Sequence, residues 1–230
     1  MTSIRLPATF GLIAACVSVY FAVAVVGSQT GTPLNVGLVS QPGNVLILGA
    51  LVPLYVAQGE AWRLVTSAFL HAGFIHLAMN MLALYFLGSF AEITFGRNRF
   101  FALYFISGIA GGLALLYFGA ANSPAVGASG AIFGLAGGVF GFAVRRGTFS
   151  TRDPVLRQLL FITAINLAIG ATIPGVSNTA HVGGLVGGLI FGYLMAPTVF
   201  SQKRLVAATP VLAAFGLETL LLGIWYLYVL

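Results

Sequence analysis

The sequence predicts an all-α protein that crosses a membrane several times, rather than a soluble globular domain. Hydrophobic residues make up 59% of its 230 residues and charged residues only 6%, whereas about 25% of a soluble domain is charged. The mean hydropathy is +1.03. The ten basic and four acidic residues are too few to solvate the surface of a soluble protein of this size. The chain is therefore expected to fold with the lipid bilayer as its main surroundings.

Seven apolar segments approach the length of about 20 residues that a helix needs to cross a bilayer. The first follows a single basic residue, Arg5, and is not followed by a small-residue cleavage site, so we interpret it as a retained span rather than a signal peptide. The predicted spans are residues 8–27, 74–95, 100–119, 127–144, 156–173, 178–197 and 206–229.

The only long connection, at about 28–73, has its own composition. It begins with turn-forming glycines and prolines, continues with an apolar patch that Pro53 interrupts, and then reaches Glu60, Trp62 and Arg63. The patch is too short to cross the bilayer, and tryptophan is enriched at the level of the headgroups. We expect a partly embedded interfacial element.

Basic residues fall almost entirely in alternate gaps between the spans. By the positive-inside rule, this asymmetry places the amino terminus in the cytoplasm and, with seven spans, the carboxyl terminus outside, as expected for the plasma (inner) membrane. The basic residues form no surface with interleaved aromatic residues, so no nucleic acid partner is expected. Arg63 alone lies on the outer side, whereas nine lie on the cytoplasmic side: Arg5, Arg97, Arg99, Arg145, Arg146, Arg152, Arg157, Lys203 and Arg204.

The fourth and sixth spans are rich in glycine at a spacing of four residues. Helices in lipid associate through close backbone approach, which glycines at positions i and i+4 permit. We therefore predict that these two spans pack against each other. The glycines concerned are Gly130, Gly134 and Gly138 in the fourth span and Gly184, Gly188 and Gly192 in the sixth.

Polar residues are costly inside hydrocarbon and are therefore candidates for function. Ser129 lies sixteen residues before Arg145, or about 24 Å along a helix, and His181 lies near the outer end of the sixth span. His76 and Asn80 occupy the first turns of the second span. The pattern predicts that these four side chains share one level in the outer leaflet.

A serine and a histidine at one level indicate hydrolytic chemistry. A neutral imidazole can remove the proton of a serine hydroxyl, so Ser129 is the candidate nucleophile and His181 the candidate base. His76, Asn80 and the Ser129 backbone N–H are candidate donors to a developing oxyanion. Acidic residues are scarce near His181, so we expect a dyad in which packing orients the imidazole. His71 lies about 140° from His76 around a helix and is expected to have a different role.

Several of these residues have simpler interpretations when each is taken alone. Ser129 could bond back to its own helix, His76 and Asn80 could form an interhelical hydrogen bond, and Asn166 in the fifth span is most typical of a contact between helices. The three histidines lack the His-Glu-x-x-His pattern of zinc proteases, so no metal is expected. A small transporter would require charged groups near the midplane and inverted repeats, neither of which is clear here.

Five motifs of this chain, in their order and spacing, resemble the motifs of the rhomboid intramembrane serine proteases. The resemblance extends over about residues 55–200. Each piece is common, but the joint pattern is specific. The matching segments are Trp62-Arg63, the His71, His76 and Asn80 series, Glu92 with Gly96-Arg97, Gly127-Ala128-Ser129-Gly130, and Ala180-His181 followed by Gly184 and Gly188.

The resemblance implies a six-helix core within residues 1–205 and an additional helix at 206–230. It implies a Ser129 nucleophile, a His181 base, and oxyanion assistance from Asn80 and His76. It also implies a protease that cleaves transmembrane segments of other membrane proteins without a cofactor. The alternative is an inactive rhomboid-like scaffold that binds client helices, and the oligomeric state stays open. Residues implied to be structural near the site are His71, Phe133, Gly127, Gly130 and Gly184.

Overall fold

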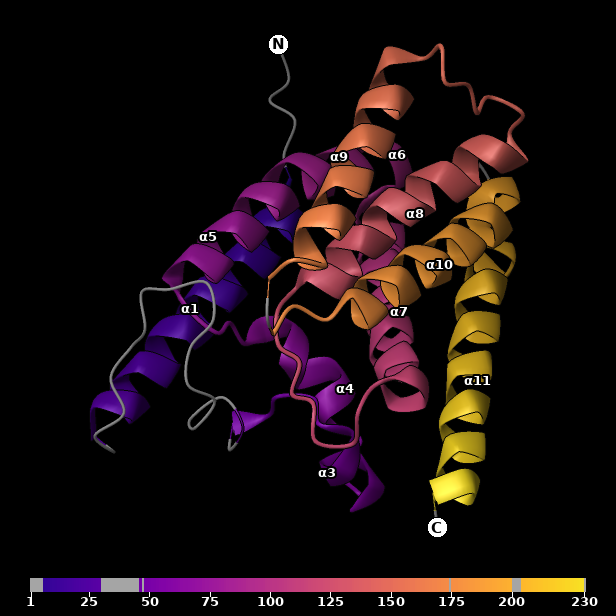
Figure 1. Cartoon of the computed structure of the whole chain (residues 1–230). Helices are drawn as coiled ribbons and strands as arrows, with labels where there is room; N and C mark the ends of the chain where they lie inside the picture. Colours follow the sequence, from indigo (N-terminus) through magenta and orange to yellow (C-terminus); the bar gives the residue numbers. More distant parts are fainter. Residues whose placement is uncertain (1–5, 30–45, 47, 174, 200–203, 230) are drawn as a thin grey trace.

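The computed structural model describes residues 6–29, 46, 48–173, 175–199 and 204–229. Within these residues the chain is helical apart from connections and one isolated antiparallel bridge between Leu51 and Ala125. The elements form one bundle (Figure 1). They are α1 (Pro7–Gln29), α3 (Pro53–Ala57), α4 (Arg63–Thr66), η1 (Ser67–Phe69), α5 (Phe74–Ala83), η2 (Leu84–Gly88), α6 (Ser89–Phe95), α7 (Arg97–Phe118), α8 (Ser129–Arg145), α9 (Pro154–Gly170), α10 (Asn178–Met195), η3 (Ala196–Thr198) and α11 (Arg204–Val229).

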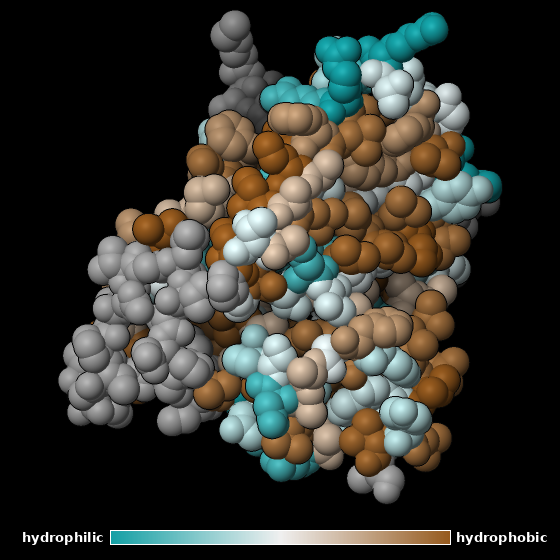
Figure 2. All heavy atoms as spheres, viewed as in Figure 1, coloured by the Kyte–Doolittle hydropathy of each residue, from teal (hydrophilic) through white to brown (hydrophobic). Residues whose placement is uncertain are grey.

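Five helical segments of the described chain are long and apolar enough to cross a membrane, and they make the protein a multi-pass membrane protein. They are Pro7–Val26, Phe74–Phe95, Arg97–Phe118, Asn178–Thr198 and Ala208–Val229. Apolar side chains cover the middle of the molecule in Figure 2, and hydrophilic residues gather at its ends. The second span is continuous through α5, the π-helical segment η2 and α6.

The fourth and fifth predicted spans correspond to shorter helices, so their predicted bounds were wrong by a few residues. α8 begins at Ser129 rather than at 127, and α9 ends at Gly170 rather than at 173; each has 17 residues. Two sequence features explain α9: Asp153 caps its first turn through Val155 and Leu156 N–H, and Gly175 adopts a positive φ in the connection that follows. The prediction that α8 and α9 also cross the membrane, which would bring the number of spans to seven, stays a prediction.

The predicted contact between the two glycine-rich helices is confirmed. Gly130, Gly134 and Gly138 of α8 face Gly184, Gly188 and Gly192 of α10, one to one. A Cβ built at any of the three α10 glycines would overlap the carbonyl oxygen of its partner on α8. The backbones therefore touch directly, which only residues without side chains allow.

Glu92 of α6 fastens the first helix to the bundle. Its carboxylate accepts hydrogen bonds from the backbone N–H groups of Ala8 and Thr9, at 3.1 and 2.8 Å, and from the Thr9 hydroxyl at 2.7 Å. These N–H groups belong to the first turn of α1, where no helical acceptor exists. A remote carboxylate thus caps α1 and also faces the positive end of its dipole.

The long connection between the first two spans is described in part. Residues 30–45 and 47 lie outside the described residues; they include the first part of the connection and, of the predicted interfacial patch at 45–56, only Val45 and Ile47. In the described part, Arg63 is buried and donates to Glu60 at 2.6 Å and to the carbonyl oxygen of Ala50 at 2.9 Å. Its guanidinium also lies 4.7 Å from the ring centres of Tyr55 and Trp62. Trp62 is half exposed, as a residue at a membrane interface would be.

The last helix, α11, packs along the outside of α7 (Figure 1). Trp225 Nε1 donates to the carbonyl oxygen of Leu116 at 2.9 Å, and the Tyr226 hydroxyl donates to that of Val56 at 2.6 Å. α11 begins at Arg204, close to the predicted start of the additional helix at 206. The division into a core of residues 1–205 and a separate segment 206–230 stays a prediction.

Candidate active site

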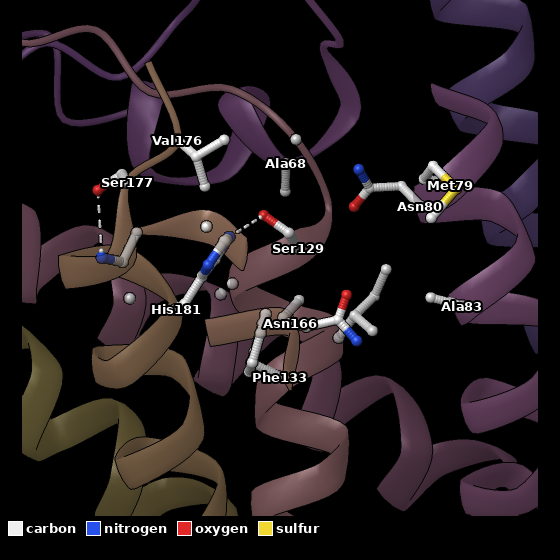
Figure 3. A pocket seen from close by; sticks show the side chains of 18 of the residues that line it. Ala68, Met79, Asn80, Ala83, Ser129, Phe133, Asn166, Val176, Ser177 and His181 are labelled. Atoms are coloured by element: carbon white, nitrogen blue, oxygen red, sulfur yellow. Dashed lines mark hydrogen bonds between the residues drawn. The ribbon is translucent and has the colours of Figure 1, made fainter. Parts of the chain in front are cut away.

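Ser129 and His181 meet at the centre of the bundle. Ser129 Oγ lies 2.8 Å from His181 Nε2, and Figure 3 shows the two side chains pointing toward each other from α8 and α10. The backbone contact between Gly130 and Gly184 lies one residue after Ser129 and three after His181. The close approach of the two helices therefore places the hydroxyl within hydrogen-bond reach of the imidazole.

Two residues orient the His181 ring. Phe133, one turn after Ser129, stacks on it with ring centres 4.5 Å apart and planes at 19°; that packing orients a catalytic base stays a prediction. Asn178 adds a contact that was not predicted from the sequence: its Oδ1 lies 3.2 Å from His181 Nδ1. The spacing of three residues before a candidate base on one helix is the signal that would have found it.

His76 lies beside the serine with one nitrogen already occupied. The backbone N–H of Ala72 approaches His76 Nδ1 at 3.4 Å, so Nδ1 is the acceptor and Nε2 carries the proton. A Cβ at Gly127 would lie 2.9 Å from Nε2 and 3.8 Å from Ser129 Oγ. The Nε2–H group thus lies next to the turn that leads into Ser129, where it is available as a donor.

Asn80 lies across the cavity from Ser129 (Figure 3). Its Nδ2 donates to the carbonyl oxygen of His76 at 2.9 Å, which leaves one N–H of the amide group unused. Its Oδ1 is buried and has no hydrogen-bond partner among the residues that the structure describes. Asn80 is therefore near the site, but one of the two N–H groups of its side-chain amide is already bonded to its own helix.

His71 supports the site from behind His76. The two imidazole rings pack edge to face with centres 5.3 Å apart, and His71 is buried. Burial of the imidazole, followed by the proximity of His76, lowers the pKa of His71 to about 3. His71 is thus a neutral packing partner at ordinary pH. It precedes α5, which begins at Phe74, so the premise that His71 and His76 share one helix was wrong, and the structural role expected for His71 stays a prediction.

The paired serine and histidine line a cavity of about 980 Å³. Its walls include Met79 and Leu82 of α5 and Ile162 and Ile169 of α9, all of which are also exposed on the surface. The cavity is therefore open sideways between α5 and α9. Connections at one end of the bundle, residues 123–127 and 175–177, line it as well.

Asn166 of α9 also lines this cavity, and its expected role was wrong. Its Nδ2 donates to the carbonyl oxygen of Ile162 in its own helix at 2.8 Å, instead of bonding to a neighbouring helix. The side chain is exposed and lies on the cavity side of α9 in Figure 3. The amide is satisfied locally and faces open space, which a contact between helices would have filled.

The fold and the site together define a polytopic helical membrane protein with a partly buried serine–imidazole pair. Residues 58–198 match the family model described as Rhomboid domain, which covers more than half of the chain. The chain belongs to the rhomboid family.

Curated relatives agree with this assignment. The rhomboid protease GluP of Bacillus subtilis is 35% identical over 78% of this chain and 33% of its own length. RHOMBOID-like protein 1 of Arabidopsis thaliana is 43% identical over 64% of this chain and 38% of its own. A third relative, inactive RHOMBOID-like protein 8 of Arabidopsis thaliana, is 34% identical over 55% of this chain and 36% of its own length. The chain thus spans about a third of the length of these relatives.

Proposed function

We propose that this protein is an intramembrane serine endopeptidase that cleaves transmembrane segments of other membrane proteins. The observation that carries the proposal is the 2.8 Å contact between Ser129 Oγ and His181 Nε2 inside a cavity that opens sideways. Relatives include both a named protease and a named inactive protein. Family membership alone therefore leaves activity open, and the proposal depends on the geometry of the pair.

In the proposed mechanism His181 Nε2 takes the proton of the Ser129 hydroxyl as Oγ attacks the scissile carbonyl. The tetrahedral intermediate places a negative charge near the start of α8. Ser129 is the first residue of α8, so its N–H has no helical acceptor and is free to donate. His76 Nε2–H is the second donor and Asn80 Nδ2 the third. His181 then returns the proton to the leaving amine, and water attacks the acyl-enzyme by the same route.

The cavity supports lateral entry of the substrate. A single transmembrane helix reaches Ser129 from the lipid between α5 and α9, while water enters between the connections at 123–127 and 175–177. Backbone amides are protected within a helix, so segments with glycine, proline or other poor helix formers should be cleaved in preference.

We also infer the orientation from the distribution of basic residues. The connection between α8 and α9 carries Arg146 and Arg152 and lies at the end of the bundle opposite α3 and α4 (Figure 1). The positive-inside rule assigns this end to the cytoplasm. The single cysteine, Cys16, is buried, so a Cys16→Ala background with Thr151→Cys tests the assignment. An impermeant maleimide should label that cysteine only after the cells are opened.

An activity-based probe tests the proposed function. A fluorophosphonate should label the purified protein in detergent, and Ser129→Ala and His181→Ala should reduce labelling and cleavage of a reporter transmembrane substrate by about 1000-fold or more. Ser18→Ala, which removes an exposed serine on α1, is the matched control and should behave as wild type. An inactive scaffold would not react with the probe, and labelling that survives Ser129→Ala would assign the nucleophile elsewhere.

A further inference from the structure

Asn178 connects two helices through one side chain. Its Nδ2 donates to the carbonyl oxygen of Leu167 on α9 at 2.9 Å, and its Oδ1 lies 3.2 Å from Nδ1 of His181 on α10. Asn178 is itself the first residue of α10. The amide therefore links the end of α9 directly to the ring that contacts Ser129.

The direction of the amide is dictated by its partner on α9. A backbone carbonyl oxygen can only accept a hydrogen bond, so the NH₂ group of Asn178 must face Leu167 and the amide oxygen must face His181. An oxygen at this position requires a proton on His181 Nδ1. The lone pair of the imidazole is then on Nε2, toward Ser129 Oγ, which is the tautomer that a general base needs.

The fit of Asn178 against α9 depends on a glycine. A Cβ at Gly170 would lie 2.6 Å from Asn178 Oδ1 and 3.2 Å from Val176 Cγ1. Any side chain at position 170 would therefore push the amide oxygen or the end of α9 away. The last turn of α9 thus provides both the acceptor and the space for the residue that faces the base.

α9 is also a wall of the cavity, which Thr163, Asn166 and Ile169 line. We propose that Asn178 is a positioning residue that selects the catalytic tautomer of His181. Through its bond to Leu167, this selection depends on the position of α9. This inference rests on the proposed protease function. A substrate that displaces the end of α9 acts on the base through the bond between Asn178 and Leu167.

Kinetics of two variants at one position test the positioning role. Asn178→Ala removes the acceptor for Nδ1–H and should lower kcat by about tenfold or more, with KM within about twofold. Asn178→Asp keeps an acceptor for Nδ1–H but loses the donor to the Leu167 carbonyl oxygen, so it should recover part of the lost kcat. The control is Thr179→Ala, the adjacent half-buried polar residue of α10. Wild-type kcat in Asn178→Ala, or no recovery in Asn178→Asp, would overturn the assignment.

A double-mutant cycle tests the dependence on α9. Gly170→Ala should lower kcat by about tenfold when Asn178 is present and far less in the Asn178→Ala background, because the crowded amide oxygen is then gone. Gly216→Ala on α11, where a Cβ meets nothing within 4 Å, controls for a general effect of alanine in a helix. Independent, multiplicative effects of the two substitutions would show that α9 does not act through Asn178.

A spectroscopic readout separates this inference from the proposed function. In ¹⁵N-histidine-labelled protein, with His181 assigned through His181→Gln, the ring nitrogens should report a proton on Nδ1 in the wild type and a mixture of tautomers in Asn178→Ala. This result does not require cleavage or probe labelling. A protein that fails to react with the probe contradicts the proposed function, whereas an unchanged tautomer in Asn178→Ala contradicts the positioning role.

Discussion

Replacing Gly188 by alanine tests whether direct backbone contact between α8 and α10 holds the reactive pair together. The new Cβ would overlap the carbonyl oxygen of Gly134, and nonbonded C···O contacts settle at about 3.3–3.6 Å, so the helices must separate by more than about 1 Å. Gly188 lies about two turns after His181. The same displacement at His181 would stretch its 2.8 Å contact with Ser129 beyond hydrogen-bond range.

The expected loss follows from this displacement. Overpacking of this kind costs about 1–3 kcal/mol of unfolding free energy, and a misplacement of about 1 Å at the reacting atoms costs about 100-fold in rate. Wild type and Gly188→Ala are compared in one detergent by the fluorescence of the two tryptophans during thermal unfolding, and by the rate of fluorophosphonate labelling.

A glycine with free space is the control for that experiment. Gly223→Ala on α11 meets nothing within 4 Å, and alanine is the better helix former, so this variant should match or exceed the wild-type melting temperature. If Gly188→Ala also unfolds and reacts like the wild type, the contact between α8 and α10 does not position the pair, and the reasoning from glycine spacing is refuted.

Three further substitutions test parts of the scaffold. Glu92→Gln should lower the unfolding free energy by about 1–3 kcal/mol, because the cap of α1 loses its charge, and thermal unfolding at neutral pH would measure this; an unchanged midpoint would contradict the capping role. Arg63→Lys should cost about 2 kcal/mol, since lysine cannot reproduce the contacts with Glu60 and two aromatic rings, and the same assay applies. Burial lowers the pKa of His71 to about 3, so the contribution of the neutral imidazole to the free energy of unfolding is complete above pH 6.5 and is lost as the pH falls toward 3. By pH 4.5 the free energy of unfolding should have fallen by about 2–3 kcal/mol for this reason. His71→Phe should flatten that part of the stability profile, and an equally steep profile would contradict the neutral, buried state.

The packing of α8 on α10 could be predicted from the sequence because it follows from one local rule. Glycines four residues apart form a flat face on a helix, and two such faces allow backbones to touch where side chains would not. The level of Ser129 relative to His181 then follows from counting residues along each helix. The contact between these residues therefore needed no information beyond spacing and the polarity of the surroundings.

The orientation of the base could not be predicted in the same way. The bond from Asn178 to Leu167 depends on how the chain returns after α9, through a connection whose path no periodicity specifies. An asparagine at the start of an apolar helix is equally typical of a cap. In this protein Ser177 supplies the cap, by accepting from the N–H of Ala180, which leaves the Asn178 amide free to face α9 and His181.

Hydropathy also could not predict the late start of α8, at Ser129 rather than at 127, and this start has a chemical consequence. If the helix extended one turn toward its amino end, the Ser129 N–H would bond to the carbonyl oxygen of Ala125, four residues earlier. That oxygen instead accepts from Leu51 N–H at 2.9 Å, and Gly127 leaves the helical path with a φ of +117°. In lipid an unused N–H would be costly, but this one lines a cavity. The bridge between Leu51 and Ala125 thus preserves the donor that the proposed oxyanion requires, and the part of the first loop that it belongs to contributes to the site without touching Ser129.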